Sequence, residues 1–258
     1  MDEPVLHARQ LRKSFRGQAA VDGVDLNVLA GERVGLLGAN GAGKTTTLLM
    51  CLGAITPDHG EIDVLGHRLP AGRSEAMVGV GFAAGYLPLP EKLRVSEVLG
   101  MFAELYGVRD TRGAVRAGLE RFRIGHLANA VGTELSSGQR TLVGIVRATV
   151  HRPRLLILDE PTASLDPDVA QRVRIGLEEL CRDDGIALLV TSHNMAEVER
   201  LCQRVLFMKA GKVILAGTPG EVAASSGHGT LEDVFLELYA TPGDMRGGHD
   251  REEDARPA

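Results

Sequence analysis

A glycine-rich stretch near the N-terminus constrains this chain more than any other feature. Residues 38–45 read Gly-Ala-Asn-Gly-Ala-Gly-Lys-Thr and match the spacing GxxxxGK followed by Ser or Thr in full. A short apolar run, 33–37, precedes the stretch, and residues 45–51 favour the start of a helix. A glycine turn between a buried strand and a helix points backbone N–H groups at bound phosphates, and the helix dipole favours the same negative charge. The sequence therefore predicts a site for a nucleoside triphosphate.

The residue types in this stretch suggest separate roles in holding phosphate. Lys44 is expected to reach the β- and γ-phosphates, and the hydroxyl of Thr45 is expected to ligate Mg²⁺. A chance glycine turn is the alternative, but a full match between a strand and a helix argues against it. The predicted ATP-binding residues in and beside this loop are Gly38, Ala39, Asn40, Gly41, Ala42, Gly43, Lys44, Thr45 and Thr46.

Two acidic residues, Asp159 and Glu160, directly follow the apolar run 155–158. Such a run is typical of a buried parallel strand, whose carboxyl end would bring Asp159 beside the phosphate loop. In phosphate-loop NTPases an aspartate at this place holds Mg²⁺, and Glu160 next to it would polarise the attacking water as a general base. Solvated acids at the end of a strand are the alternative, which would be preferred if no phosphate loop were present.

Composition argues against a nucleic-acid partner. The net charge is −5 and the isoelectric point is about 5.9, so no overall basic field would attract DNA or RNA. Aromatic residues make up 3% of the chain and Trp is absent, which disfavours stacking platforms for single strands. We therefore expect no nucleic-acid partner.

Cysteine usage and hydropathy indicate the compartment. Cys51, Cys181 and Cys202 form no CxxC pair and lie in apolar surroundings, which predicts buried free thiols in a reducing cytoplasm. The N-terminus is acidic and unlike an export signal, and the longest apolar runs fall well short of the roughly 18 residues of a membrane span. Any membrane role is therefore expected to come through a partner.

The pattern along the chain predicts strands alternating with helices, and hence a mostly parallel α/β sheet. A helical stretch over 95–124 interrupts this alternation, and a later helix over 168–182 has Asp166 as its N-cap and Pro167 in its first turn. The tail 241–258 is polar and is expected to be disordered. Strands are predicted at 19–29, 33–37, 61–64, 78–82, 155–158 and 186–190.

The pentapeptide Leu135-Ser136-Ser137-Gly138-Gln139 resembles the LSGGQ signature of the ATP-binding subunits of ABC transporters, with Ser137 as its only departure. A serine hydroxyl, a close backbone at Gly138 and a helix N-terminus suit a γ-phosphate. The resemblance implies that this motif faces the ATP held by a second copy, in a head-to-tail dimer. Its expected residues for binding ATP across the dimer are Ser136, Gly138, Gln139 and, from the similar D-loop 164–166, Asp166.

Two further positions match the family. Phe15 corresponds to an aromatic residue that stacks on adenine, with an ordinary core phenylalanine as the alternative. Residues 191–193 follow a predicted buried strand and resemble the H-loop, whose histidine contacts the γ-phosphate. The resemblance therefore implies that His193 is catalytic together with Glu160.

The resemblance covers about residues 4–240 and implies an α/β fold of the phosphate-loop NTPase class. It implies a core with a mostly parallel sheet, a β-subdomain and an inserted helical subdomain. We expect a single ABC ATPase domain over 1–240. Its parts are a nucleotide-binding core at about 1–89 and 139–222, a helical subdomain at about 90–138 and a C-terminal helix at about 230–240.

One family feature is missing. Family members carry a glutamine on the loop entering the helical subdomain, where it contacts Mg²⁺ or the attacking water. Here no glutamine occurs between Gln18 and Gln139, and the expected position falls near Ala83 or Ala84. We hypothesise that a water replaces the missing ligand and that hydrolysis survives, at a lower rate. The apolar residues of the same loop, 86–89, offer a contact surface for a partner, with loop packing as the alternative.

The segment 231–238 resembles the C-terminal helix of type-2 ABC exporter ATPases, which serve drug, polysaccharide and lipid-linked export. The resemblance implies an ATP-hydrolysing subunit with ATP and Mg²⁺ as cofactors. Its expected partners are a second copy and an integral membrane permease, which would hold it peripherally on the inner, cytoplasmic face of the membrane. The alternatives are an ABC ATPase that does not serve transport and an ATP-sensing module with weak hydrolysis. Long coiled coils and tandem cassettes, typical of the first alternative, are absent from this sequence.

Overall fold

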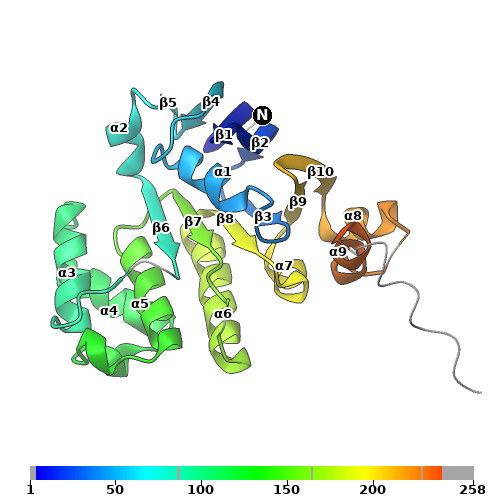
Figure 1. Cartoon of the computed structure of the whole chain (residues 1–258). Coiled ribbons are helices and arrows are strands. Elements are labelled where there is room, and N and C mark those ends of the chain that lie inside the picture. The colour runs from blue at the N-terminus through cyan, green and yellow to red at the C-terminus, as the bar shows by residue number, and fades with distance from the viewer. Residues whose placement is uncertain (1–3, 86–87, 164, 228, 240–258) are drawn as a thin grey trace, which may run out of the picture.

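The computed structural model describes residues 4–85, 88–163, 165–227 and 229–239 (Figure 1). The predicted disordered tail, 241–258, lies outside these residues. Two β-sheets with helices around them make up the described chain. The central sheet has the strand order β10-β9-β3-β8-β7-β6. Its strands are β3 (Arg33–Leu37), β6 (Val80–Ala84), β7 (Leu155–Asp159), β8 (Ala187–Ser192), β9 (Arg204–Lys209) and β10 (Lys212–Gly217).

Neighbouring strands of the central sheet are parallel, except that β10 returns antiparallel to β9. Every residue of β7 and β8 is buried, because both faces of the sheet are covered. This explains why their sequences read as continuous apolar runs. The predicted α/β fold with a mostly parallel sheet is confirmed.

The second sheet is antiparallel, in the order β2-β1-β4-β5. The first strand was not predicted, because bulges near Leu11 and a left-handed Gln10 (φ 47°) break its alternation of apolar and polar residues. Positive φ angles at Arg16 and Gly17 make the tight turn that joins it to the next strand. The strands are β1 (Leu6–Phe15), β2 (Gln18–Val28), β4 (His59–Val64) and β5 (His67–Arg68).

Helices alternate with single strands or short groups of strands along the chain, and a helical group lies between β6 and β7 (Figure 1). The predicted helical stretch 95–124 is split into α3 and α4, because Gly107 adopts a left-handed φ of 71° and Asp110 caps the second helix by accepting from Gly113 N at 2.9 Å. The helices are α1 (Lys44–Cys51), α2 (Arg73–Met77), α3 (Val95–Leu105), α4 (Thr111–Arg121), α5 (Ser137–Thr149), α6 (Pro167–Asp184), α7 (Met195–Leu201), α8 (Pro219–Ser225) and α9 (Leu231–Tyr239).

The two faces of the central sheet belong to two different cores. On one face, Leu36 and Ile157 pack with α1 and the antiparallel sheet. On the other face, Leu158 and Phe207 pack with α5, α6, α7 and the C-terminal helices. The phosphate loop lies between these cores, at the edge of the sheet where the parallel strands end.

The predicted free thiols are buried. Burial raises the pKa of Cys51 and of Cys202 to about 12, so neither thiol forms a reactive thiolate near neutral pH. Across the described ranges, no helix has the length and apolar character that crossing a membrane requires.

Candidate functional site

The phosphate loop leaves β3 at Leu37 and enters α1 at Lys44. Gly38, Gly41 and Gly43 have φ angles of 151°, 81° and 106°, a region that side chains rarely adopt. A Cβ on Gly38 would lie 2.4 Å from the carbonyl oxygen of Met208, and one on Gly43 would lie 2.4 Å from that of Ala20. Gly38 and Gly43 are therefore required by both backbone conformation and close packing, whereas Gly41 is required by its backbone conformation alone.

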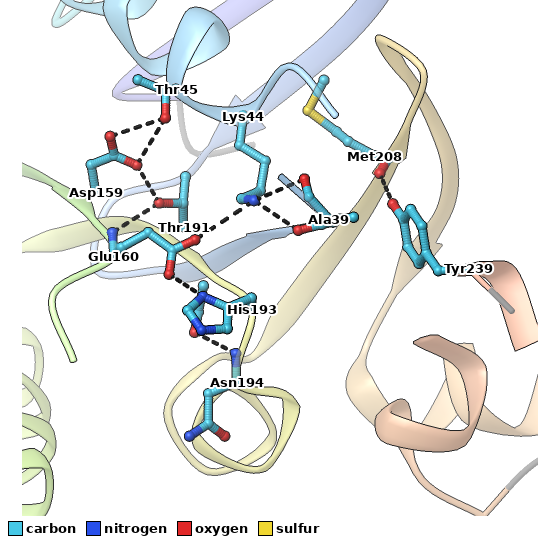
Figure 2. Close-up of polar contacts among 12 residues, drawn as sticks. Ala39, Lys44, Thr45, Asp159, Glu160, Thr191, His193, Asn194, Met208 and Tyr239 are labelled. Atoms are coloured by element: carbon cyan, nitrogen blue, oxygen red, sulfur yellow. Dashed lines mark hydrogen bonds and ion pairs between the residues drawn. The ribbon is translucent and has the colours of Figure 1, made fainter. Parts of the chain in front are cut away.

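The side chain of Lys44 lies inside this loop and is only 6% exposed (Figure 2). Its ammonium donates to the carbonyl oxygens of Gly38, at 2.7 Å, and Ala39, at 3.2 Å. It also lies 3.6 Å from Oε1 of Glu160. A buried cation must be partnered, and here backbone dipoles and one carboxylate supply the partners.

The remaining loop residues differ in their exposure. Asn40, Gly41 and Thr45 are exposed, Thr46 is half-buried and Ala42 is buried. The loop therefore offers its tip and the beginning of α1 to solvent, where a triphosphate would approach.

Thr45 and Asp159, predicted to hold Mg²⁺, lie together. The threonine hydroxyl is 3.1 Å and 3.4 Å from the two carboxylate oxygens of Asp159, and the carboxylate side chain is buried. Hydroxyl and carboxylate oxygens suit Mg²⁺, which is usually held by one or two carboxylates together with water and substrate phosphates. Among the described residues, no group of three or more His, Cys, Asp or Glu side chains forms a metal site of another kind.

Thr191 contributes to the site in a way that the sequence did not reveal. It pairs with Asp159 in the register of β8 against β7 and is fully buried. Its hydroxyl donates to Oδ1 of Asp159 at 2.6 Å and accepts from the backbone N–H of Glu160 at 3.0 Å (Figure 2). The only signal in the sequence was a polar residue directly after the apolar run 186–190.

Glu160 and His193 face one another across the site. Oε2 of Glu160 lies 2.5 Å from Nδ1 of His193, while its other carboxylate oxygen faces Lys44 (Figure 2). The backbone of Glu160 is left-handed, with a φ of 51°. Such a conformation persists only where its surroundings enforce it, and here the hydrogen bond from Glu160 N to Thr191 is one such restraint.

The signature residues begin α5. Ser136 is the N-cap: its hydroxyl accepts from Gln139 N at 3.2 Å, and Gln139 Oε1 accepts from Ser136 N at 2.9 Å. This reciprocal pair satisfies two free N–H groups at the helix start. Gly138 is half-buried, and a Cβ there would lie 3.4 Å from Val169 of α6.

Asp166 is the N-cap residue of α6, and its side chain makes no capping hydrogen bond. Ser164 of the same predicted loop lies outside the described residues. Within the described part of the chain, the hydrogen bonds and ion pairs of the phosphate loop do not include Ser136, Gly138, Gln139 or Asp166. Within the described residues, polar contacts therefore join the phosphate loop to the strand ends but not to these four residues, although Ser137 of the signature lines the same cavity as Thr45 and Asp159.

Phe15 ends β1 with a side chain that is 47% exposed, so the alternative of an ordinary core phenylalanine does not apply. The ammonium of Lys13 lies 5.7 Å from the centre of its ring and forms an ion pair with Asp58 at 2.7 Å. An exposed aromatic ring at the end of a hairpin offers a face on which a nucleobase can stack.

The loop that lacks a glutamine begins at the end of β6. Ala84 pairs with Asp159 in register, so both side chains lie on the same face of the sheet, and Ala83 points to the other face. A cavity of about 660 Å³ adjoins both alanines, Asp159 and Glu160. Tyr86 and Leu87 of the predicted contact surface lie outside the described residues.

Known proteins resemble this chain in sequence. The sequence pattern of the family described as "ABC transporter" matches residues 21–163. "Nod factor export ATP-binding protein I" of Cupriavidus metallidurans is 37% identical over 223 residues, which cover 86% of this chain and 73% of that protein. "Lipopolysaccharide export system ATP-binding protein LptB" of Escherichia coli strain K12 is 36% identical over 229 residues, which cover 84% of this chain and 92% of that protein.

Solved structures agree as well. An ATP-binding subunit of an ABC transporter superposes with a TM-score of 0.83 at 28% identity, covering 91% of this chain and 99% of the other. A dimeric bacterial ABC transporter cassette superposes with a TM-score of 0.75 at 24% identity, covering 83% and 98%. The second likeness concerns the fold alone. Sequence pattern, relatives and site geometry together establish that this chain belongs to the ABC transporter family, as an ATP-binding subunit that hydrolyses ATP.

Proposed function

We propose that this chain energises export through separate membrane subunits by hydrolysing ATP between two copies of itself. The observation that carries the proposal is the convergence of Lys44, Thr45, Asp159, Glu160 and His193 on one edge of the sheet. The named relatives with export functions support the direction of transport. The alternatives of a non-transport ATPase and an ATP sensor are not favoured; the contact between Glu160 and His193, the proposed base and its partner, supports hydrolysis.

Phosphoryl transfer relies mainly on positioning and on charge stabilisation. On binding of nucleotide, Lys44 would exchange the carbonyls of Gly38 and Ala39 for phosphate oxygens. Glu160 would then accept a proton from the attacking water, and His193 would orient its carboxylate. Thr45 and Asp159 would hold Mg²⁺, which supplies neutralising charge at the phosphates.

The second copy would complete each site. Ser136 and Gln139 lie at the exposed start of a 13-residue helix, where N–H groups and the helix dipole favour a phosphate. Phe15 would stack on the adenine of the nucleotide in its own copy, whereas Gly138 and Asp166 would contact the nucleotide held by the partner copy.

We propose a division of the chain into a nucleotide-binding core at about 1–89 and 139–222, a helical subdomain at about 90–138 and a C-terminal helix at about 230–240.

The membrane subunit would dock in an apolar groove of about 360 Å³ between the core and the helical group. Leu105, which is 73% exposed, follows the groove residue Phe102 by one turn of α3, and Arg73 and Arg147 also line the groove. We therefore assign the groove to a short amphipathic helix of the permease, with acidic residues toward the two arginines. This contact would hold the chain at the inner face of the membrane. The groove is lined by Leu49, Leu52, Ala54, Arg73, Met77, Val80, Phe82, Phe102, Tyr106, Arg147 and Ala148.

The missing glutamine can be tested by restoring it. Ala84→Gln is expected to raise steady-state ATP turnover by up to about ten-fold, because its amide would lie on the same face of the sheet as Asp159. Ala83→Gln is the comparison variant: this side chain points to the opposite face and is buried, so no rise is expected. If both variants hydrolyse ATP at the original rate, the missing glutamine has no effect on catalysis.

Thr191→Val keeps the shape of the side chain and removes the hydrogen bonds of the hydroxyl to the Asp159 carboxylate and to the Glu160 N–H. We expect kcat for ATP to fall about ten- to hundred-fold, because one of these bonds is made to a charged carboxylate. A higher Mg²⁺ concentration for half-maximal rate should accompany the fall. Thr191→Ser retains the hydroxyl and should retain most of the activity; equal losses in the two variants would refute the role of the hydroxyl.

Glu160→Gln removes the base while keeping the size of the side chain, so a nucleotide-closed dimer should form and persist. Light scattering after gel filtration with ATP and Mg²⁺ should give twice the mass of the chain. Lys44→Ala in the same background is the control and should remain monomeric, because it cannot hold the triphosphate. A purely monomeric Glu160→Gln protein would count against the dimer.

Affinity purification from detergent-solubilised native membranes tests the permease. The tagged chain is expected to recover a partner with several apolar spans in stoichiometric amount. Leu105→Asp should lose this partner, whereas Leu236→Asp, at an exposed position of helix α9, should keep it. Recovery of the chain from the soluble fraction alone, without a membrane partner, would favour the non-transport alternatives.

A further inference from the structure

The C-terminal helix α9 ends against the phosphate loop, although about 190 positions separate them in the chain. The hydroxyl of Tyr239, the last described residue of α9, donates a hydrogen bond to the carbonyl oxygen of Met208 in β9 (Figure 2). β9 runs parallel to β3, with Phe207 opposite Leu37, so Met208 lies beside the point where the phosphate loop begins.

Met208 contacts the phosphate loop at both of its ends. Its carbonyl oxygen closes the space behind Gly38, where a Cβ would approach it to 2.4 Å, and the Tyr239 hydroxyl lies 3.1 Å from the same point. Its terminal methyl lies 3.2 Å from where a Cβ of Gly43 would be. The Met208 sulfur also accepts a weak hydrogen bond from Thr47 of α1 at 3.9 Å. A shift of Met208 would therefore disturb the packing at both ends of the phosphate loop.

The position of Tyr239 is set by the packing of α9. Leu231 and Val234 are fully buried in the core that contains Phe207. At the start of the helix, Leu231 N donates to Glu199 of α7 at 2.5 Å.

At the other end of α9, the ammonium of Lys209 donates to the carbonyl of Leu238 and lies 5.6 Å from the centre of the Tyr239 ring. A cation at the end of a helix satisfies a free carbonyl and the negative end of the dipole. Burial raises the pKa of the Tyr239 phenol, which keeps its proton available for donation. Both ends of α9 are thus anchored, and α7, to which its first residue is hydrogen-bonded, begins two residues after His193.

We propose that Tyr239 is a positioning residue for nucleotide binding, which holds the Met208 carbonyl behind Gly38 and so keeps the phosphate loop ready for the triphosphate. The inference rests on ATP binding at this loop. A loop that is already ordered loses less conformational freedom when the nucleotide binds, so its affinity is higher. The loop backbone must also exchange its contacts to Lys44 for phosphate without losing its curvature, and a fixed support behind Gly38 allows this.

Tyr239→Phe removes the hydroxyl and keeps the ring. We expect the Kd for ATP, measured by calorimetry in the presence of EDTA to stop turnover, to rise about three- to ten-fold, the range expected for one lost hydrogen bond. In steady-state assays with Mg²⁺, KM for ATP should rise by a similar factor while kcat stays within about two-fold. Lys209→Met, which frees the same helix end with the hydroxyl intact, should change KM in the same direction by a smaller factor.

Leu236→Ala is the matched control, because this leucine of α9 is 59% exposed and is separate from the phosphate loop. It should leave Kd and KM unchanged. Lys44→Ala should abolish binding and so reports on ATP binding itself. If the original protein and Lys44→Ala both fail to bind ATP, the proposed function is refuted, and the inference about Tyr239 is refuted with it. If Lys44→Ala loses binding but Tyr239→Phe does not, the inference alone is overturned.

Thermal unfolding of the nucleotide-free proteins separates positioning from folding. A raised Kd in Tyr239→Phe with an unchanged unfolding midpoint supports the inference. A lowered midpoint, with kcat reduced by the loss of folded protein and KM unchanged, would make Tyr239 a purely structural residue and overturn it.

Discussion

The site is organised around a cation that the fold has removed from water. Lys44 is almost completely buried, and its ammonium is held by the carbonyls of Gly38 and Ala39 and by the carboxylate of Glu160. A buried charge is tolerated only with such partners, so the loop must curl and the strand end must come close. Glycines with left-handed backbones allow the loop to curl, and the order of the parallel strands brings the strand end close to it. A triphosphate carries several charged oxygens and is suited to take over the place of these partners.

The parallel sheet brings the other groups to the same edge. Because β7 lies between β6 and β8, the residues that follow these strands converge without long side chains. Asp159 meets Thr45 on one side and Thr191 on the other, and Glu160 reaches both Lys44 and His193. Two separate cores hold this edge, one on each face of the sheet. The C-terminal helix belongs to one of these cores and contacts Met208, which links this helix to the nucleotide site.

Much of the fold followed from local pattern, and the exceptions have physical causes. The phosphate loop, the buried strands β3, β7 and β8 and the long helix α6 were predicted within a few residues, because full burial and helix capping leave strong signals. The strand β1 was missed because bulges interrupt its alternation. The strands β9 and β10 and the short helices α7 and α8 were also missed. The last two span seven residues each, too few for a helical period to stand out.

Local sequence patterns were enough to predict the chemistry: a phosphate loop, two carboxylates after a buried strand, a signature at a helix start and a histidine after another strand. These are local patterns, and each depends on neighbours in the chain. Which of these groups come into contact depends on how the strands and helices pack. The hydroxyl of Thr191 joins Asp159 to Glu160, Ala84 shares a face with Asp159, and the hydroxyl of Tyr239 lies beside Gly38, about 200 positions away in the chain. Strand order, register and helix packing create such contacts, and these depend on residues far apart in sequence, where no local pattern records them.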